Sequence, residues 1–194
     1  MKKYGLAVLM ILPVIIIMAT GCKNKTQKNI VVTSDTARFY PVNEYIVNQI
    51  NHVDSTAQFI YKITVKNGVK DSAVLTKLQF NQLAQAFLEY NISDKSIHNY
   101  YKESTFMDDA THSYTINYTS ANISLPLQTV DILLNVENSQ VKRIFLNKTK
   151  STDAGTIVEK DGWKSDESFF INRATEKNGG TFTEQNTVVW RIEP

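Results

Sequence analysis

The chain has 194 residues, of which 42% are hydrophobic and 21% charged, so it is long enough to bury a core of its own. Its formal net charge of +2 comes from 21 basic and 19 acidic side chains, without the clustered basic excess that nucleic-acid binding requires. The single cysteine, Cys22, excludes an internal disulfide and a multi-thiolate metal site.

The first 21 residues have the composition of a secretory signal. Lys2 and Lys3 precede an apolar run over residues 6–18, and small residues follow it. The run has about 13 residues, fewer than the roughly 20 that span a bilayer as a helix, and Pro13 interrupts it. We therefore expect residues 1–21 to be a cleaved signal peptide and not an anchor helix.

Residues 19–22, Ala-Thr-Gly-Cys, resemble the lipobox of bacterial lipoproteins. The resemblance implies that Cys22 is diacylated on sulfur, becomes the N-terminus of the mature chain and attaches it to a membrane. Cleavage would remove two lysines and no acid, which leaves 173 residues with 19 basic and 19 acidic side chains. Residues 22–36 are polar, and we expect them to form a tether whose lysines lie near lipid headgroups. Residues 37–194 would then form a single globular domain.

The residues after the cysteine suggest a location. Lys23 stands where an aspartate would resemble an inner-membrane retention signal, and residues 24–28 lack the acidic cluster that resembles a surface-export signal. These differences favour a lipid anchor in the outer membrane, with the domain facing the periplasm.

Two helices are predicted in the first half of the domain. Pro41 opens a segment over residues 42–51 with apolar side chains at helical spacing. A second helix, over residues 77–90, is predicted because Thr76 and Gln79 form a capping box, with Leu75 and Phe80 as the hydrophobic staple.

A β-hairpin is predicted between these helices. Residues 57–66 alternate, with Phe59, Tyr61, Ile63 and Val65 on one face, and Asn67-Gly68 suits a type I′ turn to a strand over residues 69–75.

The second half of the domain is predicted to be a series of short strands. Residues 91–109 are interpreted as irregular, with Tyr100, Tyr101 and Phe106 as anchors. Turn residues separate the strands that follow, which are predicted over residues 113–120, 129–136, 141–148, 155–163, 168–175 and 187–192.

This order of elements predicts an α+β fold. We expect a twisted antiparallel meander with one main capped helix packed on one face. The runs 133–134 and 144–146 are apolar on both sides, which indicates central strands covered on both faces. The alternative is a partly closed antiparallel β-barrel.

The lipobox, the hairpin leading into residues 70–72 and the capped helix together resemble small envelope lipoproteins of Gram-negative bacteria. Residues 161–165, Asp-Gly-Trp-Lys-Ser, and the strand 188–190, Val-Val-Trp, extend the resemblance. It implies an envelope location and no particular activity.

Candidate chemistry is sparse. Asp108, Asp109 and His112 offer carboxylate and imidazole ligands, but no second histidine has ligand spacing, so we favour a polar loop and expect no metal or other cofactor. Asp131 interrupts an apolar run; facing inward it would need a partner or a shifted pKa, and we favour the outward orientation. The sequence has no G-x-S-x-G elbow and no glycine-rich phosphate loop, so no catalytic residue is predicted.

Three Asp-Ser/Thr dipeptides resemble the acceptor site at which some bacteria O-glycosylate exported proteins. The candidate acceptors are Thr36, Ser55 and Ser72. Such dipeptides are also common in turns and caps, which is the alternative interpretation.

These observations predict a lipid-anchored, non-enzymatic protein that binds or scaffolds another envelope component, for which another envelope protein is a candidate, with no nucleic-acid partner. One alternative is an anchored hydrolase of envelope glycans or peptides. A second is a carrier of a small apolar ligand, which would require a barrel with an internal cavity.

Overall fold

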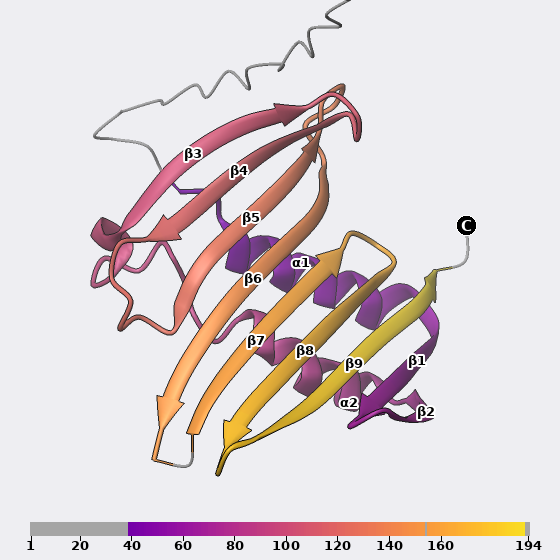
Figure 1. Cartoon of the computed structure of the whole chain (residues 1–194). Helices are drawn as coiled ribbons and strands as arrows, with labels where there is room; N and C mark the ends of the chain where they lie inside the picture. The colour runs from indigo at the N-terminus through magenta and orange to yellow at the C-terminus, as the bar shows by residue number, and fades with distance from the viewer. Residues whose placement is uncertain (1–38, 154, 193–194) are drawn as a thin grey trace, which may run out of the picture.

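The computed structural model describes residues 39–153 and 155–192. It shows one sheet of nine antiparallel strands with two α-helices on one face (Figure 1). The predicted signal, Cys22, the tether and Thr36 lie outside the described residues. In chain order the elements are α1 (Val42–Thr56), β1 (Ala57–Lys66), β2 (Val69–Leu75), α2 (Lys77–Ala84), the 3-10 helices η1 (Gln85–Phe87) and η2 (His98–Tyr100), β3 (Tyr101–Asp108), β4 (Ser113–Ser120), β5 (Leu127–Asn135), β6 (Val141–Thr152), β7 (Gly155–Lys164), β8 (Ser168–Lys177) and β9 (Gly180–Ile192).

The sheet confirms the predicted α+β class. Its strand order is β2-β1-β9-β8-β7-β6-β5-β4-β3, so β3 to β9 form a continuous meander and the β1–β2 hairpin joins it beside β9. The outermost strands, β2 and β3, are the two edges of an open sheet, so the alternative of a closing barrel is wrong. None of the helices in residues 39–153 and 155–192 is long and apolar enough to cross a membrane.

The β1–β2 hairpin has the predicted bounds. Asn67 and Gly68 have φ values of 47° and 83°, the left-handed conformation that a type I′ turn requires. The predicted alternation is also present, but Phe59 and Tyr61 are exposed whereas Ile60 between them is buried. The apolar face predicted from the sequence is therefore the face that points away from the helices.

The start of α2 confirms the capping box. The Gln79 backbone N–H donates to the Thr76 hydroxyl at 3.2 Å, and the Thr76 backbone N–H donates to the Gln79 side chain at 2.9 Å. The helix is shorter than predicted, because it tightens into η1 after Ala84 and ends at Phe87. At this end the Ala86 carbonyl accepts a hydrogen bond from a lysine of the sheet, which replaces the next helical bond.

Helix α1 begins at the predicted position and is longer than predicted. Pro41 is its N-cap, and the Pro41 carbonyl accepts from the Tyr45 N–H at 3.0 Å. The helix continues past residue 51 to Thr56, because Val53 adds a buried position to the stripe that contains Ile46 and Ile50.

All strands predicted after residue 113 are present, and several are longer than predicted. The largest extension is β9, which begins at Gly180 and not at residue 187. The prediction of an irregular segment over residues 91–109 is wrong for β3, which pairs along its whole length with β4. This edge strand is mostly polar and has only Tyr101 and Thr105 buried, so it lacks the apolar alternation that reveals a strand.

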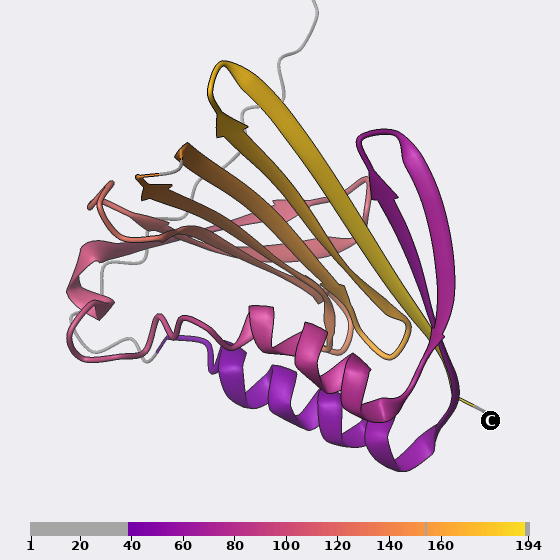
Figure 2. The ribbon, with the colours of Figure 1, turned by 90° about the horizontal axis from the view of Figure 1, so that it is seen from below.

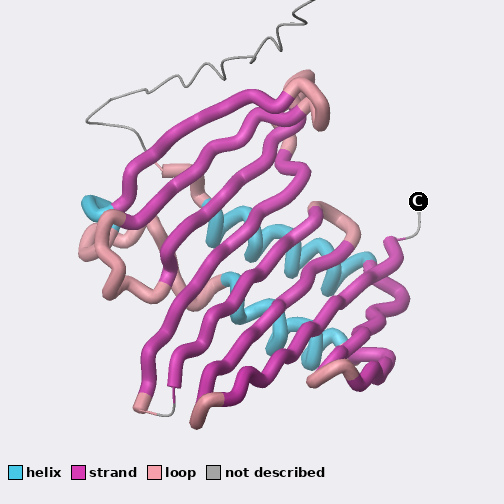
Figure 3. Tube along the Cα trace, viewed as in Figure 1, coloured by secondary structure: helices cyan, strands magenta, loops and turns pink. Residues whose placement is uncertain are grey.

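The core lies between the helices and the sheet (Figure 2). Its centre is a cluster of five aromatic rings, with neighbouring ring centroids 5.1 to 6.3 Å apart. Its members are Phe80, Phe87, Trp163, Phe169 and Trp190. Both helices cross the strand direction on this same side (Figure 3). The prediction that the central strands are covered on both sides is wrong for the described part of the chain.

Candidate functional site

The strand register divides the sheet into two faces. The helix face carries a row of residues that lie opposite one another in successive strands: the partly buried Ile116 and the buried Ile132, Ile144, Trp163, Phe169 and Val188. The open face carries the side chains that alternate with them, among them Phe59, Tyr61, Val74, Phe145 and Phe170. Charged side chains that could take part in binding or catalysis occur on both faces. The charged side chains of the two faces differ in how far solvent reaches them.

A cluster of buried charges lies on the helix face, at the end of η1. The Lys148 ammonium donates to the Ala86 carbonyl at 2.6 Å, to Glu159 Oε1 at 2.9 Å and to Asp161 Oδ2 at 2.5 Å. These three acceptors use all three N–H groups of the lysine. The cluster thus fastens the end of η1 to the adjacent strands β6 and β7.

The cluster continues into a row of alternating charges across five strands. Lys148, Glu159, Arg173, Glu184 and Lys66 occupy successive cross-strand positions on β6, β7, β8, β9 and β1. Arg173 donates to Glu159 Oε2 through Nε at 2.8 Å and also through one terminal nitrogen. Glu159 is therefore held between a buried ammonium and a guanidinium, and the row becomes more exposed towards β1.

Burial and neighbouring charges shift the pKa values of the two carboxyl groups in opposite directions. Burial raises the pKa of Asp161 to about 7, and the neighbouring Glu159 carboxylate adds to this effect although Lys148 opposes it. Burial acts in the same direction on Glu159, but the hydrogen bonds and charges of Lys148 and Arg173 outweigh it and lower the pKa of Glu159. Asp161 is thus the member of the cluster that changes charge near neutral pH.

The three charged side chains that meet under η1 are almost completely buried. The side chains of Lys148, Glu159 and Asp161 are 1%, 8% and 0% exposed. Asp161 Oδ1 is buried and has no hydrogen-bond partner in the described structure. A carboxyl with a raised pKa is a candidate general acid only where it touches a reactant, so we interpret the cluster as a structural device.

The open face carries a shallow groove over Gly162. The Phe145 and Phe170 rings flank this glycine with centroids 6.3 Å apart, and a Cβ at Gly162 would collide with the Phe170 ring. A hollow of about 180 Å³ lies here, and Arg143, Lys164, Glu167 and Ser168 also line it. The groove therefore combines aromatic and charged groups on a surface open to solvent.

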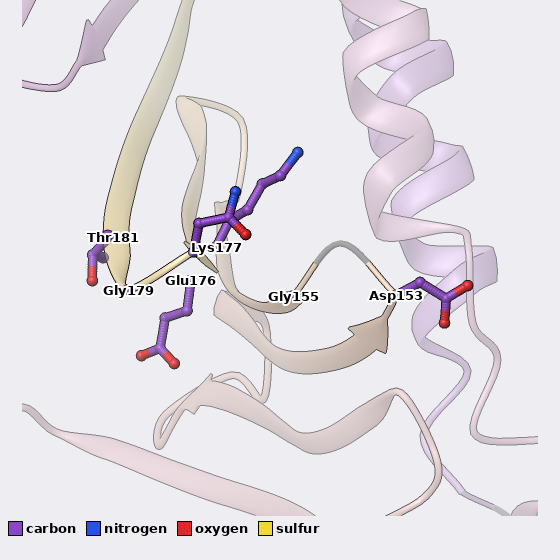
Figure 4. A pocket seen from close by; sticks show the side chains of 8 residues that line it. Asp153, Gly155, Glu176, Lys177, Gly179 and Thr181 are labelled. Atoms are coloured by element: carbon purple, nitrogen blue, oxygen red, sulfur yellow. The ribbon is translucent and has the colours of Figure 1, made fainter.

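A larger hollow of about 400 Å³ lies at the tips of two hairpins (Figure 4). The turn after β6 contributes Asp153 and Gly155, and the β8–β9 turn contributes Glu176, Lys177 and Thr181. The side chains of Glu176 and Lys177 point away from each other, and the three charged residues are all exposed. Water screens such charges, and nothing in the geometry makes them converge on a ligand.

The predicted metal-ligand candidates lie in a turn. The Asp108 carboxylate accepts from the Thr111 hydroxyl at 2.8 Å and from the Ala110 N–H at 3.0 Å, and these bonds lower its pKa. His112 is at the turn with a φ of 47°. No group of three or more His, Asp or Glu side chains in residues 39–153 and 155–192 has the geometry to hold a metal ion.

The other predicted sites lie apart from the buried cluster. Asp131 is on the open face, as favoured from the sequence, and accepts from the Asn117 side chain at 2.6 Å. Ser55 is exposed at the end of α1, where its hydroxyl donates to the Asn51 carbonyl at 3.0 Å. Ser72 is exposed in the edge strand β2. O-glycosylation at Ser55 and Ser72 remains a prediction.

Sequence reasoning missed the charged cluster, although one signal for it was present. In residues 158–163 the period of a strand places Glu159 and Asp161 on the same side as Trp163. A buried tryptophan in such a strand implies that both carboxyls are buried with it and need a cation. The identity of that cation depends on the register with β6, which the sequence does not specify.

Comparisons of the sequence with models of protein families and with curated proteins, and of the structure with solved structures, find no match.

Proposed function

We propose that this chain is a lipid-anchored, non-enzymatic protein of the cell envelope that binds another envelope component through the open face of its sheet. The observation that carries the proposal is the difference between the two faces. The two α-helices pack on the helix face, whereas no described element covers the open face (Figure 2). The open face nevertheless displays aromatic and aliphatic side chains. Contiguous exposed apolar groups on a folded domain are typical of an interaction surface.

The apolar side chains of the open face concentrate near the β1–β2 end of the sheet. Phe59, Tyr61 and Val74 are exposed there, and Tyr61 and Val74 are direct cross-strand partners. Along the same face lie Phe145 and Phe170 at the groove over Gly162. Two large rings with adjacent charged groups form the kind of anchor at which binding energy concentrates in protein interfaces.

The two alternatives have less support. A hydrolase would need acids or histidines that converge in an open cleft. The acids that converge in the described residues, Glu159 and Asp161, are instead buried beneath η1. The carrier of an apolar ligand required a barrel with an internal cavity, whereas this sheet is open.

The experiment is photo-crosslinking in intact cells from two positions of nearly equal exposure. A photoreactive residue replaces Phe59, 66% exposed on the open face, or Leu78, 68% exposed on α2. We expect discrete adducts from position 59 and none from position 78, with both proteins acylated and membrane-bound. Adducts from position 78 alone, or from neither position, would contradict the proposal.

A further inference from the structure

Two opposite charges on the helix face lie directly across from each other without pairing. Arg173 of β8 and Glu184 of β9 are cross-strand partners, a placement that ordinarily yields an ion pair. Among the ion pairs of the described residues, Arg173 instead joins Glu159, and Glu184 lies 3.9 Å from Lys66. Each of the two side chains thus forms its ion pair with a neighbour on its far side, and no ion pair joins Arg173 to Glu184 directly.

A pocket of about 200 Å³ occupies the space between them and the end of α2. Arg173 and Glu184 supply one charge of each sign to its wall. The remaining lining residues are Gln82, Leu83, Ala86, Ile171 and Asn186. This volume is below the roughly 300–1,000 Å³ of pockets for drug-sized ligands, so the occupant must be small.

Both charged groups keep capacity for a ligand. Arg173 uses Nε and one terminal nitrogen on Glu159, which leaves N–H donors of its guanidinium available. Glu184 accepts from the Asn186 side chain at 2.9 Å, and Asn186 itself accepts from the Thr64 hydroxyl at 2.8 Å. This chain of hydrogen bonds fixes the Glu184 carboxylate, and Glu159 fixes the guanidinium, so the charges are held in place before a ligand arrives.

We propose that this pocket binds a free α-amino acid in its zwitterionic form. The ligand carboxylate pairs with Arg173, because a guanidinium suits planar carboxylates. The ligand ammonium pairs with Glu184, and Leu83 and Ile171 contact the ligand side chain, which favours small and aliphatic amino acids. A molecule with only one of the two charges would leave the opposite wall of the pocket unpaired. The site lies on the helix face, so it is independent of the open-face function.

The first test compares L-leucine with two analogues that each lack one of its two charges. L-leucine, N-acetyl-L-leucine and L-leucinamide are titrated by calorimetry into the full acylated protein in detergent. We expect L-leucine to bind and each analogue to bind about tenfold or more weakly, because each lacks one of the charged groups. Absence of heat with L-leucine and with L-alanine up to about 10 mM, or equal binding of all three leucine compounds, would overturn the proposal.

The second test uses matched variants of the charged row. Glu184→Gln removes the ammonium partner, whereas Lys66→Gln removes a cation that contacts Glu184 but does not line the pocket. We expect the Glu184 variant to lose about tenfold or more in affinity for L-leucine, without loss for N-acetyl-L-leucine, and the Lys66 variant to keep the wild-type affinity. Equal losses of affinity for L-leucine in both variants, with melting temperatures unchanged, would show that Glu184 does not bind the ammonium group of the ligand.

Discussion

Replacement of Asp161 by asparagine should remove most of the pH dependence of the domain's stability above about pH 5. Burial raises the pKa of Asp161 to about 7 from an ordinary value of 3.8, so the folded chain holds a proton that the unfolded chain has released. Because the folded pKa is raised, the stability it contributes is fully present below pH 3.8 and is lost as pH rises through 7.

The magnitude follows from the width of this window. At about 1.4 kcal/mol per pH unit, the free energy of unfolding should fall by about 2 to 3 kcal/mol between pH 5 and pH 8. The lowered pKa of Glu159 acts in the opposite direction, but it does so below the ordinary glutamate value of 4.5 and therefore outside this range.

The assay is urea unfolding at the two pH values, followed by the fluorescence of the buried Trp163 and Trp190. The difference between wild type and Asp161→Asn isolates this carboxyl, because all other titrating groups are common to both proteins. Asp131→Asn, on the open face, is the control and should keep the wild-type dependence. Equal stability of the wild type at both pH values, or a pH dependence in Asp161→Asn equal to that of the wild type, would show that Asp161 does not titrate in this range.

Three further predictions concern the anchor and the helix. Cys22→Ala should abolish incorporation of a palmitate analogue, and equal labelling of the variant would remove the basis for lipidation. Thr76→Ala should lower the free energy of unfolding by about 1 kcal/mol, the usual worth of an N-cap, and an unchanged urea midpoint would argue against it. Phe87→Ala should cost about 3 to 5 kcal/mol in the same assay, because its ring is fully buried; a cost below that of Thr76→Ala would contradict the packing.

Local signals predicted the parts of the fold that depend on local chemistry. The Asn67-Gly68 turn and the Thr76 capping box are formed by residues close together in the chain, and both are present. The end of α2 was mispredicted because a distant residue, Lys148, takes the carbonyl that the next helical turn would use. Strand β3 was missed because an edge strand with little burial needs no apolar alternation.

The candidate sites depend on register, which no local pattern supplies. Lys148, Glu159 and Arg173 meet because β6, β7 and β8 align them in one cross-strand row. A one-residue shift would place each of them on the open face. For the same reason, the alternation of Phe59 and Tyr61 predicted a strand but did not reveal which of its faces the helices cover.

The proposed function requires that a partner covers the open face in the cell, and the accessibility of introduced cysteines measures whether that face is covered. Cys22 is the only cysteine of the sequence, so Phe59→Cys and Leu78→Cys each introduce a single free thiol once Cys22 is acylated. Labelling by a membrane-permeant maleimide is compared between intact cells and purified protein. We expect position 59 to react several-fold more slowly in cells and position 78 to react at the same rate in both. Equal protection at the two positions, or no protection at position 59, would show that no partner covers the open face.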